Sequence, residues 1–246
     1  MNERLRQLLK ELASKYRRWG HPKLYVLVRR QGIMVNHKRT EKIYREEGLS
    51  LRIRRRKKLA AVTRTPATQA TRPNERWAMD FVHDSLWSGR RFRCLTLVDT
   101  FTKNSLVIEV DTSLNGVRVV RVLEGLYKLQ GLPESIRVDN GPEFISKALD
   151  EWAYRRGVKL DFIRPGKPTD NSYVESFNGK FRYECLNQNY FLDLREAKGV
   201  IEDWRIQFNT VRPHDSLGDL TPDEFMRQYE QQNNNLNPRE FSLPVA

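Results

Sequence analysis

The 246-residue sequence has no run of about 18 uncharged apolar residues, the length that a membrane-spanning helix needs. Its opening stretch, MNERLRQLLKEL, is charged from the third residue and does not resemble a secretory signal. Cysteine is scarce, since Cys94 and Cys185 lie far apart and form no CxxC pair. This excludes a disulfide framework and a cysteine-based zinc site, and we expect both thiols in the core. These absences predict a cytoplasmic protein with no membrane partner.

Acidic residues are few in the first third of the chain. Residues 1–76 contain 22 lysines and arginines against 6 aspartates and glutamates, whereas residues 77–246 contain 22 against 25. The formal net charge of +13 therefore comes entirely from the first segment. A surface that merely kept the protein in solution would spread its charge more evenly, so the asymmetry favours a polyanionic partner.

The basic segment, residues 1–58, predicts a small all-α domain. Apolar residues at helical spacing and helix-breaking glycines predict helices at residues 2–18, 23–31 and 37–47. A short helix, a tight turn and a basic helix form the layout of a DNA-binding helix-turn-helix. The alternative is a helical bundle with solvated charges. The DNA-facing candidates on the third helix are Lys38, Arg39, Lys42 and Arg45.

A linker at residues 59–75, rich in threonine and proline, leads to a segment with a different pattern at residues 76–230. Its strand-like and helical runs predict an α/β fold, a mixed sheet with helices on its faces. The expected strands are 77–82, 93–99, 105–110, 135–139 and 158–163, and the expected helices are 113–130, 142–156, 172–187 and 193–208. We expect residues 231–246 to form a poorly ordered tail.

Three carboxylates stand out in this segment. Asp80 interrupts an apolar strand, Asp139 follows a strand in RVDNGPEF, and Glu175 lies on a helix. Each has an ordinary explanation, which is a structural hydrogen bond for Asp80, a turn for Asp139 and solvation for Glu175. Brought together, they would repel one another and resist ionisation unless cations lay between them. Oxygen-only ligands select hard ions such as Mg²⁺ or Mn²⁺.

The helix expected at residues 172–187 has an apolar face and a different, polar face. The polar face carries Glu175 together with Asn178, Gly179 and Arg182. A lone glutamate on such a helix is usually solvated. Here the glycine would let a ligand approach closely and the arginine suits phosphate, so Glu175 is a candidate site residue.

Four ordered segments resemble a known family: RWAMDFV, VDNGPEF, IRPGKPTDNSYVESFNGKFRYECLN and FNTVRPHDSLGDLTPDEF. They are similar to segments of the integrase-core protein encoded by the second reading frame of a large bacterial insertion-sequence family. The carboxylate spacing, with 35 residues between Asp139 and Glu175, resembles the DDE triad of retroviral-integrase-like transposases. The front of the chain resembles the helix-turn-helix-like domain of that family, and the whole likeness covers about residues 15–226.

The resemblance implies a ribonuclease-H-like fold with a mixed five-stranded sheet. It also implies a DNA transposase that cleaves DNA and transfers strands, with two Mg²⁺ or Mn²⁺ ions in each active site. Asp80, Asp139 and Glu175 would be the catalytic and metal-binding residues, and Asn178 and Arg182 would face the DNA. The implied partners are element ends and target DNA, a protein from an upstream reading frame (or a fusion to it), and further copies of the chain on DNA. The expected location is the bacterial nucleoid.

Two other functions remain open from the sequence. A hydrolytic ribonuclease-H-like nuclease would use the same three carboxylates without joining strands, and a remnant of an element would bind DNA without catalysis. The stretch FNTVRPHDSLGDLTP, residues 208–222, has two interpretations. Its Arg212 and His214 either contact phosphate or hold the C-terminal helix in place.

Overall fold

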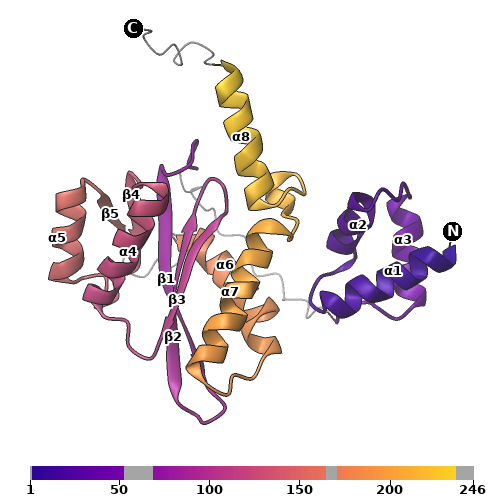
Figure 1. Ribbon diagram of the computed structural model, residues 1–246, viewed down its shortest axis with the longest axis horizontal. Coiled ribbons are helices and arrows are strands. Elements are labelled where there is room, and N and C mark those ends of the chain that lie inside the picture. Colours follow the sequence, from indigo (N-terminus) through magenta and orange to yellow (C-terminus); the bar gives the residue numbers. More distant parts are fainter. Residues whose placement is uncertain (1, 53–68, 165–170, 237–246) are drawn as a thin grey trace, which may run out of the picture. The chain divides into compact units, whose positions relative to one another are not determined.

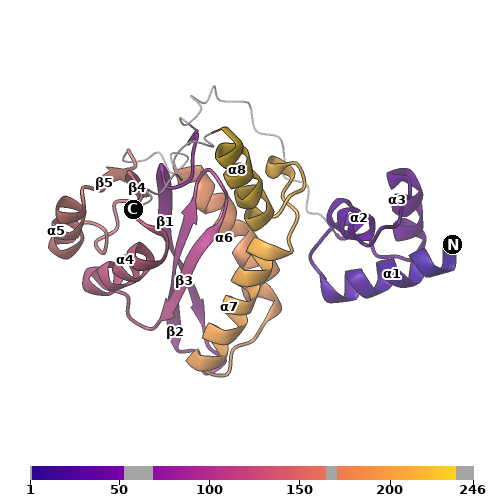
Figure 2. The same cartoon turned by 45° about the horizontal axis from the view of Figure 1, so that its top comes forward.

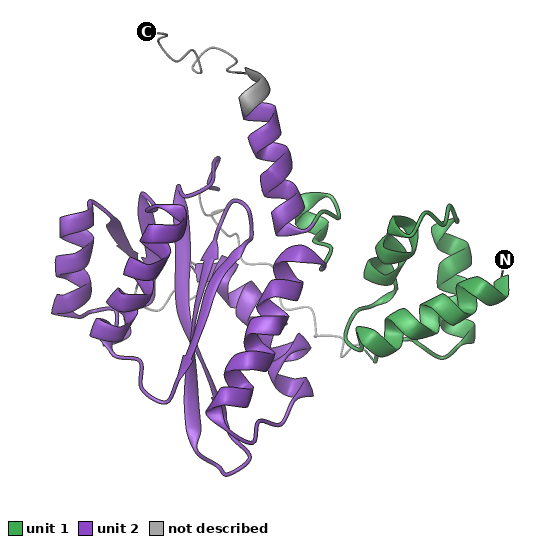
Figure 3. Ribbon diagram, in the orientation of Figure 1, with its two compact units in different colours: residues 1–66, 212–220 green, residues 67–211, 221–246 purple. Residues whose placement is uncertain are grey.

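The computed structural model describes residues 2–52, 69–164 and 171–236 (Figure 1). The chain divides into two compact units, an N-terminal unit of residues 1–66 with 212–220 and a core unit of residues 67–211 with 221–246 (Figure 3). Most of the expected linker falls outside the described residues, so the expected domain boundaries stay predictions. Within the described residues, no helix is both long and apolar enough to span a bilayer.

The N-terminal unit contains three helices, α1 (Asn2–Lys15), α2 (His21–Arg30) and α3 (His37–Glu46). Pro22 lies in the first turn of α2, where its missing N–H costs nothing, and the Asn36 side chain accepts a hydrogen bond from the backbone N–H of Lys38 to cap α3. All three helices bury leucine, isoleucine or valine side chains in one core. The buried residues of α3 leave its basic side chains on the exposed face.

The core unit is built on a five-stranded sheet with the strand order β3-β2-β1-β4-β5. The strands are β1 (Arg76–Ser85), β2 (Arg91–Asp99), β3 (Ser105–Asp111), β4 (Ser135–Val138) and β5 (Lys159–Phe162). The first three pair antiparallel, whereas β4 runs parallel to both β1 and β5. The mixed five-stranded sheet predicted from the sequence is therefore confirmed.

Helices cover both faces of this sheet (Figures 1 and 2). Alternate residues of β1 enter separate cores, with Trp77 and Met79 on one face and Ala78 and Val82 on the other. The helices on the first face are α4 (Gly116–Gln130) and α5 (Lys147–Arg156), and those on the second are α6 (Ser172–Glu184) and α7 (Leu194–Thr210).

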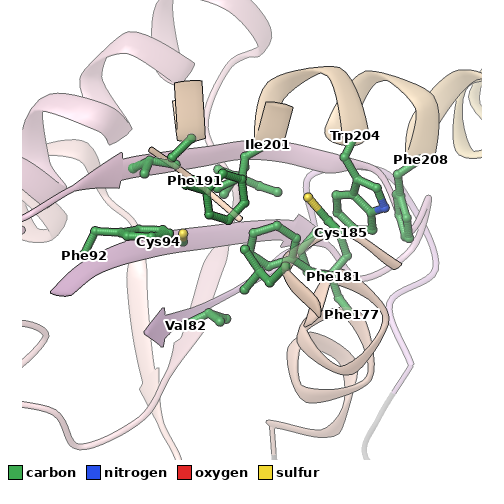
Figure 4. Close-up of a cluster of buried hydrophobic side chains, with 14 of the residues drawn as sticks. Val82, Phe92, Cys94, Phe177, Phe181, Cys185, Phe191, Ile201, Trp204 and Phe208 are labelled. Carbon is green, nitrogen blue, oxygen red and sulfur yellow. The ribbon is translucent and has the colours of Figure 1, made fainter. Parts of the chain in front are cut away.

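Aromatic side chains hold α6 against α7 (Figure 4). The Phe177 ring lies 5.7 Å from Trp204 and 5.0 Å from Phe208, measured between ring centroids. Cys94 and Cys185 are buried in the same cluster as free thiols, as expected, and burial raises the pKa of Cys185 to about 12. This packing fixes which face of α6 turns toward β1.

Two sequence predictions were wrong at element boundaries. The helix expected at 142–156 begins only at Lys147, because the Ser146 side chain caps it by accepting the Leu149 backbone N–H. The tail expected from residue 231 starts too early, because α8 (Pro222–Leu236) runs through its first residues. Thr221 and Glu224 cap the start of α8 reciprocally, each side chain accepting the other residue's backbone N–H.

Candidate active site

Asp80 lies in the middle of β1 and points toward α6. Its Oδ1 accepts a 2.7 Å hydrogen bond from the backbone N–H of Phe81, and its Oδ2 accepts one of 2.8 Å from Asn178 Nδ2. The side chain is half-buried. Two hydrogen-bond donors therefore face this aspartate in its apolar strand, and both stabilise the ionised carboxylate.

Asn178 is itself held by a buried threonine. The Thr96 hydroxyl lies 2.9 Å from Asn178 Oδ1 and 3.1 Å from the carbonyl oxygen of Asp80, its partner across the β1–β2 ladder. Both ends of the Asn178 amide are thus engaged inside the protein. The DNA contact expected for Asn178 stays a prediction, and the geometry shows this residue orienting Asp80.

The charge on Asp80 is poorly compensated. Its pKa is raised to about 6, mainly by burial and further by repulsion from Asp139 and Glu175, against the lowering effect of its two hydrogen bonds. Because repulsion of this kind falls off with distance, Asp139 and Glu175 must each lie near Asp80. A bound divalent cation would relieve that repulsion.

Asp139 is the first residue after β4. Ala78 of β1 pairs with Arg137 of β4 in parallel register, so Asp80 and Asp139 each come two residues later on adjacent strands. Because side chains alternate along a strand, this step keeps both carboxylates on one face and at one level. This register favours the close approach expected for the two carboxylates, which stays a prediction.

The loop after Asp139 folds back on its carboxylate. Asp139 Oδ1 accepts a 2.9 Å hydrogen bond from the backbone N–H of Gly141. A Cβ atom at position 141 would lie only 2.9 Å from that same oxygen, so a larger residue there would push the Asp139 carboxylate out of place. The turn given above as the ordinary explanation for Asp139 is therefore present, because its side chain accepts the backbone N–H of the residue two positions later.

A charged and aromatic contact fixes the far end of this loop. Glu143 forms an ion pair with Arg93 of β2, which holds the pKa of Glu143 below its usual range. The Arg93 guanidinium lies 4.1 Å from the centroid of the Phe81 ring, and Phe81 stacks on Phe144 at 5.0 Å. The loop that carries Asp139 is thereby tied to the strands that carry Asp80.

Glu175 lies in the first turn of α6 with an exposed side chain. It is close enough to raise the pKa of Asp80, yet within the described residues no three histidine, cysteine, aspartate or glutamate side chains are grouped to hold a metal ion. Asp80 therefore has two other carboxylates in its neighbourhood, Asp139 and Glu175, and both act on its charge. The three-residue metal site itself stays a prediction.

The start of α6 is held by two contacts. The Asn171 side chain donates a 3.5 Å hydrogen bond to the carbonyl oxygen of Met79, the residue before Asp80. Lys103, in the turn between β2 and β3, lies over the Tyr173 ring at 4.0 Å, and burial lowers its pKa to about 8. These contacts locate the turn of α6 that carries Glu175.

The remaining predicted residues lie elsewhere or have other surroundings. Arg182 is exposed on α6 and donates to the carbonyl oxygen of His83, further along β1. Lys38, Arg39, Lys42 and Arg45 are exposed on α3 of the N-terminal unit, where their DNA contacts stay predictions. Arg212 and His214 are buried, which favours the structural interpretation over phosphate contact.

Sequence reasoning missed Thr96 and Arg93. Both lie on β2, opposite Asp80 and His83 of β1. Thr96 could have been identified, because it is a polar residue inside the apolar run CLTLV and a buried hydroxyl needs a hydrogen-bond partner. No local pattern identified Arg93, since its partner Glu143 is 50 residues away.

Comparison with known proteins gives the following matches. Residues 70–168 and 156–222 match the family described as Integrase core domain, and residues 1–57 match the family described as HTH-like domain. The 31.7 kDa protein of insertion element IS407 from Burkholderia multivorans is 47% identical over 228 residues, which cover 93% of this chain and 82% of that protein.

Two solved structures share the fold. The intasome of simian T-cell lymphotropic virus, solved with a PP2A regulatory subunit, matches with a TM-score of 0.60 and 17% identity over 97% of this chain and 78% of that chain. The HTLV-2 integrase catalytic core domain, solved with magnesium, matches with a TM-score of 0.50 and 20% identity over 64% of this chain and 99% of that chain.

Proposed function

The chain belongs to the integrase-core transposases of bacterial insertion sequences, of the second-reading-frame type, and we propose that it cleaves DNA and transfers DNA strands by metal-dependent phosphoryl transfer. The observation that carries this proposal is the matched register of Asp80 and Asp139, with repulsion that raises the pKa of Asp80. Such an arrangement destabilises the fold unless a cation or proton neutralises the charge. A catalytic cation held by these carboxylates explains why they stand in matched register.

The donor set fits a hard divalent cation. Asp80, Asp139 and Glu175 offer carboxylate oxygens alone, the ligands that Mg²⁺ and Mn²⁺ prefer. The magnesium bound to the HTLV-2 catalytic core, which has a similar fold, supports the same choice. Two bound ions would lower the pKa of the attacking water or 3′-hydroxyl group and neutralise charge on the leaving oxygen.

The protein's own residues prepare this site. Asn178 and Thr96 hold the Asp80 carboxylate in one orientation, so little reorganisation is needed when a ligand binds. The Gly141 N–H orients Asp139 through one oxygen and leaves the other for a cation. Arg182 is exposed on the same helix as Glu175, where its guanidinium suits the phosphates of a DNA strand.

The N-terminal unit supplies most of the DNA affinity in this proposal. Its α3 exposes four basic side chains, and Asn36 caps the helix so that its surface is presented stably. Lysine and arginine contacts to phosphate give salt-dependent binding with little dependence on base sequence. We propose that preference for element ends comes from a protein of the upstream reading frame, or from fusion to it, and that several copies of this chain act together on DNA.

A strand-transfer assay separates this proposal from hydrolysis. The chain, with its upstream partner, is incubated with Mg²⁺, a target plasmid and element-end DNA that already carries a free 3′-hydroxyl group. The proposal expects joined products that chelation of the metal abolishes. Metal-dependent cleavage without joining would favour the nuclease, and binding without any reaction would favour an inactive remnant.

A further inference from the structure

One tryptophan lies on a surface that the proposed chemistry does not use. All five tryptophans fall in the described parts of the chain, and Trp19, Trp77, Trp152 and Trp204 are buried. Trp87, at the tip of the β1–β2 hairpin, is 72% exposed. A single exposed apolar side chain is common on proteins, whereas a contiguous patch of them marks a binding surface.

Trp87 is part of a defined cluster. Its ring meets Tyr190 edge-on at 5.6 Å between centroids, and its backbone N–H donates a 2.8 Å hydrogen bond to the carbonyl oxygen of Phe191. Tyr190 is 81% exposed and Leu192 is 69% exposed. Trp87, Tyr190 and Leu192 form what is here called the aromatic corner, and its rings are held in place by the backbone contact.

The aromatic corner continues the surface of the candidate active site. The strand β1 carries Asp80 and ends at Ser85, about 17 Å away at about 3.3 Å per residue, just before Trp87. Helix α6 runs along this strand, because Asn178 contacts Asp80 and Arg182 contacts His83. An exposed arginine therefore lies between the carboxylates and the corner.

Charge around the corner favours a nucleic acid. Arg90 and Arg91 are exposed beside Trp87 on the hairpin. The acidic residues that flank the corner in the chain are Asp84 on β1 and Asp193 and Glu196 at the start of α7, and each accepts a backbone N–H group. Arginine and exposed aromatic rings together are the usual components of a single-strand binding surface.

We propose that an unpaired base of the bound DNA stacks on the aromatic corner, with Arg90, Arg91 and Arg182 on the flanking phosphates. This inference rests on the proposed function and adds the path of the DNA. Base–aromatic stacking is tolerant of sequence, so the corner holds a strand without selecting its bases.

Tryptophan fluorescence provides the test, because Trp87 is the tryptophan that a soluble quencher reaches. Acrylamide quenching of the full chain is measured with and without an oligonucleotide duplex that carries a single-stranded overhang. DNA should remove the quenchable component, and Trp87→Phe protein should show no such component in either state. Trp87→Ala should weaken binding of the overhang DNA by about 5- to 150-fold. Tyr154→Ala, at a residue 90% exposed on α5, is the matched control and should bind normally.

Two results would overturn the inference. The first is unchanged quenching of Trp87 when DNA is saturating. The second is loss of quenching with rising protein concentration in the absence of DNA, which would show that the corner binds a second copy. Metal-dependent cleavage is measured on the same samples. Cleavage without shielding of Trp87 refutes the stacking inference alone, whereas shielding without cleavage refutes the proposed function alone.

Discussion

Replacing Asp80 with asparagine should stabilise the metal-free protein. Burial and repulsion raise the pKa of Asp80 to about 6 from an ordinary value of 3.8. Below about pH 3.8 the carboxyl group is protonated in folded and unfolded chains alike. Between this pH and about 6 the unfolded chain gives up its proton first, so the stability of the wild type falls as the pH rises through this window. The asparagine variant has no carboxyl group at this position, so its stability does not fall in this pH window.

The magnitude follows from the pKa. A change from 3.8 to about 6 corresponds to about 3 kcal/mol at pH 7, at about 1.4 kcal/mol for each tenfold change in proton affinity. Since the side chain is half-buried, solvent screens part of this, and we expect a gain of about 1–2 kcal/mol.

The hydrogen bonds around position 80 can accommodate the new amide. Asp80 accepts hydrogen bonds from both Phe81 and Asn178. In the asparagine variant the new NH₂ group at position 80 would therefore face the NH₂ group of Asn178. Rotation of the Asn178 amide by half a turn restores the network, because its NH₂ group then faces the Thr96 hydroxyl, which also accepts. The stabilisation should therefore survive the substitution.

Urea denaturation at pH 4 and pH 7.5, without divalent metal, measures the effect. The control is Asp84→Asn, since Asp84 lies on the same strand and also accepts a hydrogen bond from the next backbone N–H. It should change stability by less than about 0.5 kcal/mol. Adding Mg²⁺ should stabilise the wild type but not Asp80→Asn. An Asp80→Asn protein that is less stable at pH 7.5, or whose gain is the same at both pH values, would refute the reasoning.

Three further predictions test the supporting structure. Glu143→Gln should cost about 1–3 kcal/mol at pH 7 by leaving its arginine partner unpaired, and the loss should shrink below about pH 4.5 in urea denaturation; a constant loss would contradict it. Gly116→Ala should destabilise by about 1–3 kcal/mol, because a Cβ would lie 2.2 Å from Ser146 Oγ, whereas Gly125→Ala in the same helix meets nothing and should stabilise in thermal melts. Equal effects at the two glycines would count against this packing. Replacing the four basic side chains of α3 with glutamine should lower the slope of log affinity against log salt by up to about four in binding titrations, and an unchanged slope would move the DNA contacts elsewhere.

The sequence predicted the five strands of the sheet well, including the two strands that carry or precede Asp80 and Asp139. The apolar runs in β1 and β2 are a local signal, and the aspartate that interrupts the first of them at position 80 is visible without a structure. The register that sets Asp139 beside Asp80 follows once β1 and β4 are recognised as parallel neighbours. These features depend on residues close together in the chain or on strand geometry.

The misses have tertiary causes or overlooked caps. The sequence after Pro142 suits a helix start, but the Glu143–Arg93 ion pair holds it as a loop until Ser146 caps α5. The network of Thr96, Asn178 and Asp80 joins residues more than 80 positions apart, so no window of sequence contains it. The start of α8 was readable as the capping box TPDE, whereas the polar composition from residue 231 onward suggested a tail.

The central claim is that Asp80, Asp139 and Glu175 hold the ions that act on DNA. Its most direct test is Mg²⁺-dependent cleavage and strand transfer by Asp139→Asn and Glu175→Gln proteins, with DNA affinity measured on the same preparations. The account predicts that activity falls by about 100-fold or more while DNA affinity persists, and that Asp84→Asn keeps normal activity. Normal activity in the Asp139→Asn protein would contradict it.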